Sequence, residues 1–173
     1  MIKIVQQDDP VLRELAQPVP PKDILSPKIQ KVIADMAAAL ATQDDGVAIA
    51  APQIGKPLQI FLVSGRVMAT VDKRFAAGKD MVFINPQILK ISKERHDLEE
   101  GCLSCRYLYG KMSRAVKTTI KAYDEKGSII QRGASGFLAQ IFQHEIDHLN
   151  GVLFIDNAFD LHDLPPKDGK KTR

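Results

Sequence analysis

Two histidines and a glutamate are grouped in the stretch "QHEIDHLNG", residues 143–151. His144 and His148 are four residues apart, so on a helix both imidazoles project from one face, about 6 Å from each other. Two nitrogen ligands at that separation can bind one metal ion. Glu145 can reach a water on that ion without being a ligand itself. The pattern H-E-x-x-H therefore predicts the metal site of a hydrolase.

The alternative is that both histidines lie on the solvated face of an amphipathic helix. The neighbours on the same segment argue against it because they are apolar: Ile141, Phe142, Ile146 and Leu149. We expect the helix to begin near Ser135 and to end at about Leu149, before the Asn150-Gly151 stop signal.

A catalytic site of this kind needs a third protein ligand. The metzincin pattern fails, because Phe154 stands where the third histidine should follow Gly151. The thermolysin pattern fails as well, because no glutamate follows His148. Three downstream residues stay open as weakly placed ligands, Asp156, Asp160 and His162, so we expect the third ligand upstream.

The upstream stretch "EEGCLSC", residues 99–105, offers a thiol between two extended segments. Next to a metal, Cys102 would be a bound thiolate. Alternatively, Cys102 and Cys105 form a redox pair or half of a zinc ribbon. A ribbon needs a second cysteine pair, which the sequence lacks, and a thioredoxin-like motif needs βαβ units. An inert buried Cys102 stays open on local evidence.

A third stretch, "DGVAIAAPQIG" at residues 45–55, is dominated by glycine and alanine. Such a segment lets the backbone approach a ligand closely. Gln53 then presents an amide that can donate to developing negative charge. Taken alone this signal is weak, because most loops of this composition are turns.

The elements that must position these residues follow an α+β pattern without βαβ alternation. We expect a helix in "SPKIQKVIADMAAALATQ" (26–43), capped by Ser26, and a buried strand in "LQIFLVS" (58–64). A second extended stretch (81–92) is expected to be broken by Pro86. Residues 65–80 are interpreted as a connecting loop. "AVKTTIKAYD" and "SIIQR" flank "EKG" and predict a hairpin.

Composition bounds the class of protein. The 173 residues, 45% hydrophobic and 26% charged, fit one soluble domain. We expect a single catalytic domain over residues 1–166 and a basic, disordered tail over 167–173. The tail alone carries the net charge of +3, so nothing suggests a nucleic-acid site. The opening residues predict no secretory signal and no apolar run predicts a membrane span, and two cysteines fit a reducing compartment, so we expect a cytoplasmic protein.

Taken in order, "GVAIAAPQ", "EGCLS" and "QHEIDH" resemble the three motifs of the peptide deformylases. The likeness extends to "DPVLRELAQPV", "INPQI" and "HLNGVLFID", so it covers most of the chain. It implies an α+β fold, with mixed or antiparallel β-sheets surrounding a central helix that carries H-E-x-x-H. It also implies an enzyme that removes the N-formyl group from the initiator methionine of nascent polypeptides and releases formate.

The resemblance assigns roles position by position. Cys102, His144 and His148 would hold one divalent metal ion, with a water completing the tetrahedron. Glu145 would move the water's proton to the leaving amine, while the Gln53 amide and the backbone N–H of Leu103 would face the oxyanion. The family favours Fe(II), although a thiolate with two imidazoles also accepts Zn(II), Ni(II) or Co(II).

The resemblance further implies how the substrate binds. The methionine side chain would enter an apolar pocket lined by Val47, Leu98, Phe137, Gln140 and Ile141. The extended peptide would pair with backbone near Gly46, Val47 and Gly101. Asp45, Glu100 and Arg114 are candidates to orient the metal ligands, although Asp45 and Arg114 also fit ordinary surface charges. The partners expected are formylmethionyl nascent chains and, through the basic tail, the ribosome.

Three departures from the family pattern involve four residues. Ala48 replaces a glycine, Gln140 puts an amide in an apolar wall, and Cys105-Arg106 replaces a small apolar residue and a proline. These departures keep open a deformylase-like hydrolase or peptidase of altered specificity. They also suggest that oxidation joins Cys102 to Cys105. A non-catalytic metal-stabilised binding module is a further alternative, against which Glu145 argues, because a structural site needs no such carboxylate.

Overall fold

Two antiparallel sheets form the strand framework of the computed structural model, which describes residues 2–72 and 78–165. The first sheet has the order β1-β2-β3-β6-β7 and the second the order β4-β5-β8. The strands span Ala48–Ala50 (β1), Ile60–Val63 (β2), Met81–Ile91 (β3), Arg95–Cys102 (β4), Cys105–Ala115 (β5), Lys117–Tyr123 (β6), Ile129–Ser135 (β7) and Phe159–Asp163 (β8). The helices span Pro27–Ala41 (α1), Gly65–Val71 (α2) and Gly136–Leu149 (α3).

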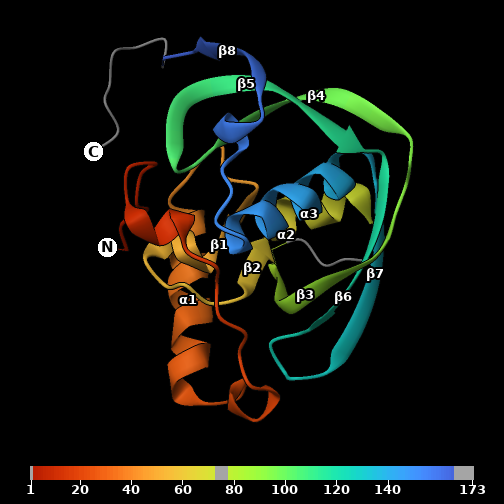
Figure 1. The fold of residues 1–173 in the computed structure, drawn as a ribbon. Coiled ribbons are helices and arrows are strands. Elements are labelled where there is room, and N and C mark those ends of the chain that lie inside the picture. The colour runs from red at the N-terminus through yellow and green to blue at the C-terminus, as the bar shows by residue number, and fades with distance from the viewer. Residues whose placement is uncertain (1, 73–77, 166–173) are drawn as a thin grey trace.

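Helix α3 lies in the middle of the molecule, with strands of both sheets around it (Figure 1). Its Phe142 is fully buried and packs its ring 5.0 Å from that of Phe83 on β3 and 5.9 Å from that of Phe61 on β2. The side chain of Gln143 bonds both the N–H and the carbonyl oxygen of Ala115, at the end of β5. The helix is therefore fixed to the first sheet by aromatic packing and to the second by an amide, as the predicted α+β class requires.

The expected helices and hairpin are present. Helix α1 begins after Ser26, whose Oγ accepts a hydrogen bond from the Ile29 N–H at 3.4 Å. Strands β6 and β7 pair in an antiparallel hairpin, as "EKG" predicts. Helix α3 ends at Leu149, and Gly151 beyond it has a φ of 71°. A side chain there would also collide with the backbone at Arg13, so only glycine fits this chain reversal.

Two local expectations are wrong. Residues 65–80, of which 73–77 lie outside the described residues, are not a plain loop. Helix α2 occupies Gly65–Val71, is capped by Ser64 and packs Met68 into the core. Pro86 does not break the second extended stretch: β3 continues across it through an irregularity in the pairing with β6. Asn85, in the left-handed region at φ 51°, anchors this point by bonding the backbone of Val19.

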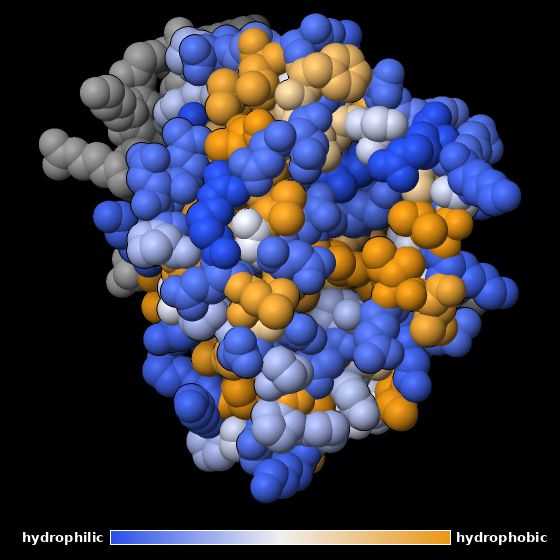
Figure 2. All heavy atoms as spheres, viewed as in Figure 1, coloured by the Kyte–Doolittle hydropathy of each residue, from blue (hydrophilic) through white to orange (hydrophobic). Residues whose placement is uncertain are grey.

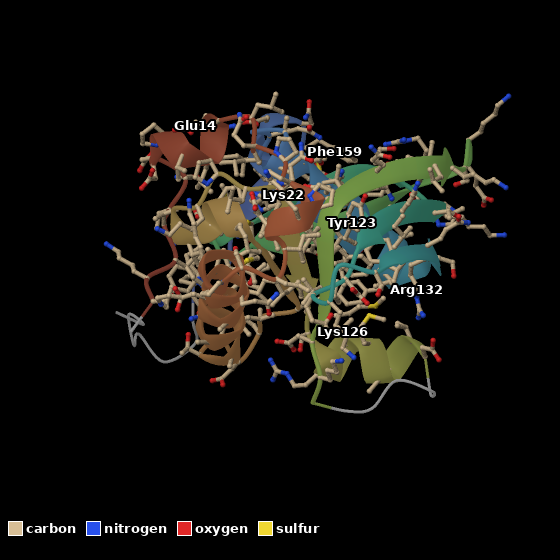
Figure 3. All side chains as sticks on the ribbon, turned by 90° about the horizontal axis from the view of Figure 1, so that it is seen from below. Glu14, Lys22, Tyr123, Lys126, Arg132 and Phe159 are labelled. Atoms are coloured by element: carbon tan, nitrogen blue, oxygen red, sulfur yellow. The ribbon has the colours of Figure 1, made fainter. Side chains whose placement is uncertain are left out.

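Long-range side-chain contacts tie the outer elements to this framework. Arg132 on β7 forms an ion pair with Asp72, directly after α2, at 2.9 Å; Figure 3 shows Arg132 beside that helix. At the opposite end, β8 exposes Phe159, Leu161 and the following Leu164. Apolar side chains gather there at the top of the face in Figure 2. No helix of the described residues is long and apolar enough to cross a membrane. The expected basic tail, residues 167–173, lies outside the described residues.

Candidate metal centre

Three side chains converge where the turn between β4 and β5 faces α3. The ligand atoms of Cys102, His144 and His148 all lie within 4.8 Å of one another. Cys102 Sγ is 3.2 Å from Nε2 of His148, and the two imidazole rings stand nearly perpendicular with centroids 4.9 Å apart. The i, i+4 spacing on α3 supplies the two histidines, and the tight turn after β4 supplies the thiol. These are the three residues predicted to bind a metal.

A buried ionic network holds the first histidine. Glu100 Oε2 lies 3.0 Å from Nδ1 of His144, while Arg114 donates two hydrogen bonds to the same carboxylate at 2.7 and 3.0 Å. Arg114 also donates to Asp147 at 2.6 Å. Burial opposes ionisation of Glu100, but the hydrogen bonds from His144 and Arg114 lower its pKa to about 2. A permanent carboxylate thus fixes the imidazole, as ligand-supporting groups do.

Asp45 does not belong to this network, contrary to one of the expectations. Its carboxylate binds Arg106 instead, 2.9 Å away, and the same guanidinium reaches the side-chain oxygen of Gln43. The Arg106 side chain thus bridges from the start of β5 to the segment before β1. Asp45 and Arg106 both line the cavity beside the centre. Arg106, one of the residues that depart from the family pattern, therefore lies at the site itself.

Glu145 places a buried carboxylate oxygen beside the ligands that has no hydrogen-bond partner among the described residues. This oxygen is Oε2, and the residue as a whole is buried. Burial raises the pKa of Glu145 to about 7. Burial also holds the pKa of His148 well below its usual range, which keeps that imidazole in the neutral form that binds metals. A carboxylate with a pKa near neutrality is suited to exchanging a proton at physiological pH.

Gln53 is held in one orientation beside the cysteine turn. Its Oε1 accepts a hydrogen bond from the Ala50 N–H at 2.8 Å, which leaves Nε2 directed at Ser104 Oγ (3.1 Å) and Cys102 Sγ (3.5 Å). The Gly/Ala stretch makes this possible, because the residues around the short helix Ala51–Ile54 are small and buried. Ala48 lies outside the positive-φ region, so the methyl that replaces a family glycine causes no backbone strain.

A cavity of about 300 Å³ opens onto this centre. Its lining includes most of the predicted substrate contacts: Val47, Gly101, Phe137, Gln140 and Ile141, together with Gln53 and Leu103. Two predicted contacts, Gly46 and Leu98, are not part of the lining. The cavity also includes wall residues that sequence reasoning missed: Glu99, Tyr107, Leu108 and Tyr109. Only the β4–β5 register could have indicated them, since Tyr109 pairs with Gly101.

Gly101 is required by that pairing. A Cβ at this position would lie 2.6 Å from the ring of Tyr109, closer than any relaxed contact. The absence of a side chain lets the tyrosine ring cover the strand backbone at the cavity wall. Cys105 pairs directly with Cys102 across the same turn, as its cross-strand partner. Cys105 is buried and packs with Leu12, Leu153 and Phe154, beneath the centre.

The donor set determines which ions fit. One sulfur and two imidazole nitrogens suit Zn(II), Fe(II), Ni(II) or Co(II), whereas Mg²⁺ and Ca²⁺ prefer oxygen ligands. The unpaired Glu145 Oε2 lies buried beside this set. A bound cation would lower the pKa of Cys102, which the neighbouring Cys105 thiol and burial raise in its absence. The residues present therefore fit a transition-metal site.

Comparisons with known proteins agree with this arrangement. The family model described as polypeptide deformylase matches residues 1–163. The peptide deformylase of Carboxydothermus hydrogenoformans is 42% identical over 157 residues, which cover 90% of this chain and 92% of that protein. A peptide deformylase structure from Legionella pneumophila shares 35% identity with a TM-score of 0.78, covering 91% and 86% of the two chains. The class I type b enzyme of Acinetobacter baumannii, solved with Met-Ala-Ser bound, has 30% identity and a TM-score of 0.78, covering 90% and 97%.

Proposed function

Because the chain belongs to the polypeptide deformylase family, we propose that Cys102, His144 and His148 hold the divalent metal ion on which its activity depends. That activity is the hydrolysis of the N-formyl group on the initiator methionine of nascent polypeptides, with release of formate. One observation carries the assignment of residues: a thiol and two imidazoles lie within 4.8 Å of one another beside a buried, unpaired carboxylate.

We infer that the ion is Fe(II), with Zn(II), Ni(II) or Co(II) as substitutes that the same ligands accept. When bound, such an ion supplies Lewis-acid chemistry, since it acidifies water and polarises a carbonyl oxygen. The Cys102 sulfur supports a transition metal of this group over Mg²⁺ or Ca²⁺. The Glu100–Arg114 pair orients His144 and keeps its Nδ1 occupied, so that Nε2 is left for the ion.

Glu145 acts as the general base and then as the general acid. Its carboxylate accepts a proton from the attacking water, and the same oxygen later gives that proton to the amine that leaves as formate separates. The raised pKa of Glu145, about 7, supports both roles, because the group can take up and release a proton near neutral pH. Its burial keeps bulk water from competing for the proton.

The developing negative charge on the formyl oxygen is met by two donors. Gln53 Nε2 is one, since its amide is already oriented by the Ala50 N–H and needs no reorganisation. The backbone N–H of Leu103, at the turn that follows Cys102, is the other. Removing one preorganised donor of this kind from an oxyanion site lowers the rate by about 10²–10³-fold.

The substrate lies in the cavity with its peptide backbone extended. The methionine side chain enters between Phe137, Gln140 and Ile141, and the backbone pairs near Val47 and Gly101. Gly46 and Leu98 contribute at the edges of this path. The short strand β1 and the edge strand β4 both offer unpaired backbone groups for such an added strand.

We further propose that residues 1–166 act as one catalytic domain and that the basic tail, 167–173, associates with the ribosome, where the substrate emerges. A cytoplasmic location follows from that substrate and agrees with two cysteines that form no disulfide.

Metal analysis of two variants tests the assignment of ligands. His148→Ala should purify with much less iron than the wild type, because it removes a ligand, whereas Glu145→Ala should retain the metal. Equal metal content in His148→Ala and the wild type would contradict the proposed centre.

A further inference from the structure

Gln140 is a polar residue in the wall of the cavity that the first substrate side chain enters. It is only 7% exposed, and it lies between Phe137 and Ile141 on α3. Gln140 precedes His144 by four residues, so both side chains project from the same face of the helix, one turn apart. The amide therefore stands directly beside the centre, in the part of the wall that a bound side chain would touch.

The orientation of this amide is fixed by its partners. Nε2 of Gln140 donates to the carbonyl oxygen of Glu99 at 2.9 Å and lies 3.4 Å from Oε1 of Glu100. Both partners are acceptors, since a backbone carbonyl oxygen can only accept and the Glu100 carboxylate already accepts two hydrogen bonds from Arg114. The nitrogen therefore points toward β4, and the oxygen must point the other way.

The Gln140 carbonyl oxygen is left without a partner among the described residues, although it is not one of their fully enclosed polar atoms. Since Gln140 lines the cavity and is otherwise buried, its Oε1 is reached from the cavity side. A purely apolar side chain that fills this space removes water from the oxygen and offers no donor in return. Burying an acceptor without a partner is unfavourable, and a side chain that brings a donor avoids this loss.

We propose that Gln140 is a specificity-determining residue whose oxygen accepts a hydrogen bond from the first side chain of the substrate. The cavity then takes formylated peptides that begin with an uncharged donor side chain of methionine's length, with glutamine as the representative, as well as formyl-methionine. The proposal rests on the deformylase activity and on the cavity as the site of the first side chain. It goes further because it assigns to this chain a weaker preference for methionine over glutamine than an apolar wall would give.

A merely structural role for Gln140 makes a different prediction. The amide also supports Glu100, so its loss could disturb His144 and slow the reaction. Such a disturbance acts on the shared chemistry and lowers kcat/KM for every peptide by the same factor. A specificity role changes the ratio between two peptides measured on the same preparation.

The test compares formyl-Met-Ala-Ser with formyl-Gln-Ala-Ser as substrates of the iron-loaded protein, following formate. We expect the wild type to hydrolyse the glutamine peptide with a kcat/KM within about tenfold of that for the methionine peptide. In Gln140→Met, which keeps the length of the side chain and removes the acceptor, the methionine-to-glutamine ratio of kcat/KM should rise about tenfold or more. Gln140→Leu is the second variant and should move the ratio in the same direction.

The outcomes distinguish failure of the role proposed for Gln140 from failure of the proposed deformylase activity. Turnover of the methionine peptide with the same ratio in the wild type and both variants would overturn the role of Gln140 and leave the deformylase activity standing. A wild type whose kcat/KM for formyl-Met-Ala-Ser is more than about a thousandfold higher than for formyl-Gln-Ala-Ser would also overturn the role of Gln140, without any variant. Failure of the iron-loaded wild type to release formate from either peptide would overturn the proposed function, and this inference with it.

Discussion

Glu100 Oε2 lies 3.0 Å from Nδ1 of His144, although the two residues are 44 positions apart in the chain. The same carboxylate accepts two hydrogen bonds from Arg114, and both side chains of this ion pair are almost completely buried. The arrangement determines which nitrogen of His144 is available as a ligand. It also places two buried charges where the loss of one leaves the other without compensation.

Removal of Arg114 should therefore affect both folding and metal binding. Arg114→Leu leaves Glu100 buried with only His144 and the Gln140 amide beside it, and we expect a loss of about 3–5 kcal/mol in the free energy of unfolding. Metal affinity should fall by about 10- to 100-fold, as for other groups that orient a ligand. Urea unfolding and competitive metal titration measure the two effects.

Arg106→Leu is the matched control for that variant. Its ion pair with Asp45 lies at the surface, with 25% of the Arg106 side chain and 60% of the Asp45 side chain exposed, so its loss should cost less than about 1 kcal/mol. Equal destabilisation by the two substitutions would contradict the role assigned to the buried network.

Burial of Glu145 should make the metal-free protein sensitive to pH. Because burial raises the pKa of Glu145 from 4.5 in the unfolded chain to about 7, the folded state binds the proton more tightly. Stability associated with the protonated group is complete below pH 4.5, declines as the pH rises toward 7, and is absent above it. Glu145→Gln removes this dependence, so at pH 8 the free energy of unfolding of the metal-free variant should exceed that of the wild type by on the order of 3 kcal/mol.

At pH 4.5 the metal-free forms of Glu145→Gln and the wild type should be nearly equally stable. Chemical denaturation of both proteins at the two pH values, in the presence of a chelator, provides the comparison. A difference that is the same at pH 4.5 and pH 8 would show that the ionisation of Glu145 is not its cause.

Oxidation is expected to link Cys102 with Cys105. The two residues are direct cross-strand partners, and both are free thiols. Hydrogen peroxide would convert the two thiols to one disulfide and two waters, which removes a metal ligand. After treatment we expect the wild type to lose both free thiols and its metal, and Cys105→Ala to form no intramolecular disulfide. Retention of the metal and two free thiols by the treated wild type would refute the idea.

The sequence predicts those parts of the fold whose determinants are local. The capped helix α1 follows from Ser26, the β6–β7 hairpin from "EKG", and the C-terminal end of α3 from Gly151. Helix α2 could not be predicted in this way, because its stability comes from burying Met68 in a core made by distant strands. Strand β8 has only exposed residues and exists because β5 offers an edge to pair with.

The candidate site shows the same division. The spacing of His144 and His148 is a local helical property, so two ligands and Glu145 could be predicted directly. The third ligand required the family resemblance, since nothing local joins Cys102 to α3. The walls formed by Tyr107, Leu108 and Tyr109 depend on the register of the β4–β5 hairpin and on a ring that covers Gly101, which no periodicity encodes.

Formate release from formyl-Met-Ala-Ser tests most directly whether Glu145 exchanges protons beside a metal held by Cys102, His144 and His148. Iron-loaded wild type, purified without oxygen, should be assayed beside Glu145→Ala at matched metal content. We predict turnover by the wild type and a loss of at least about 10²–10⁴-fold in the variant, with its metal retained. Turnover at the wild-type rate by metal-replete Glu145→Ala would contradict this role of Glu145.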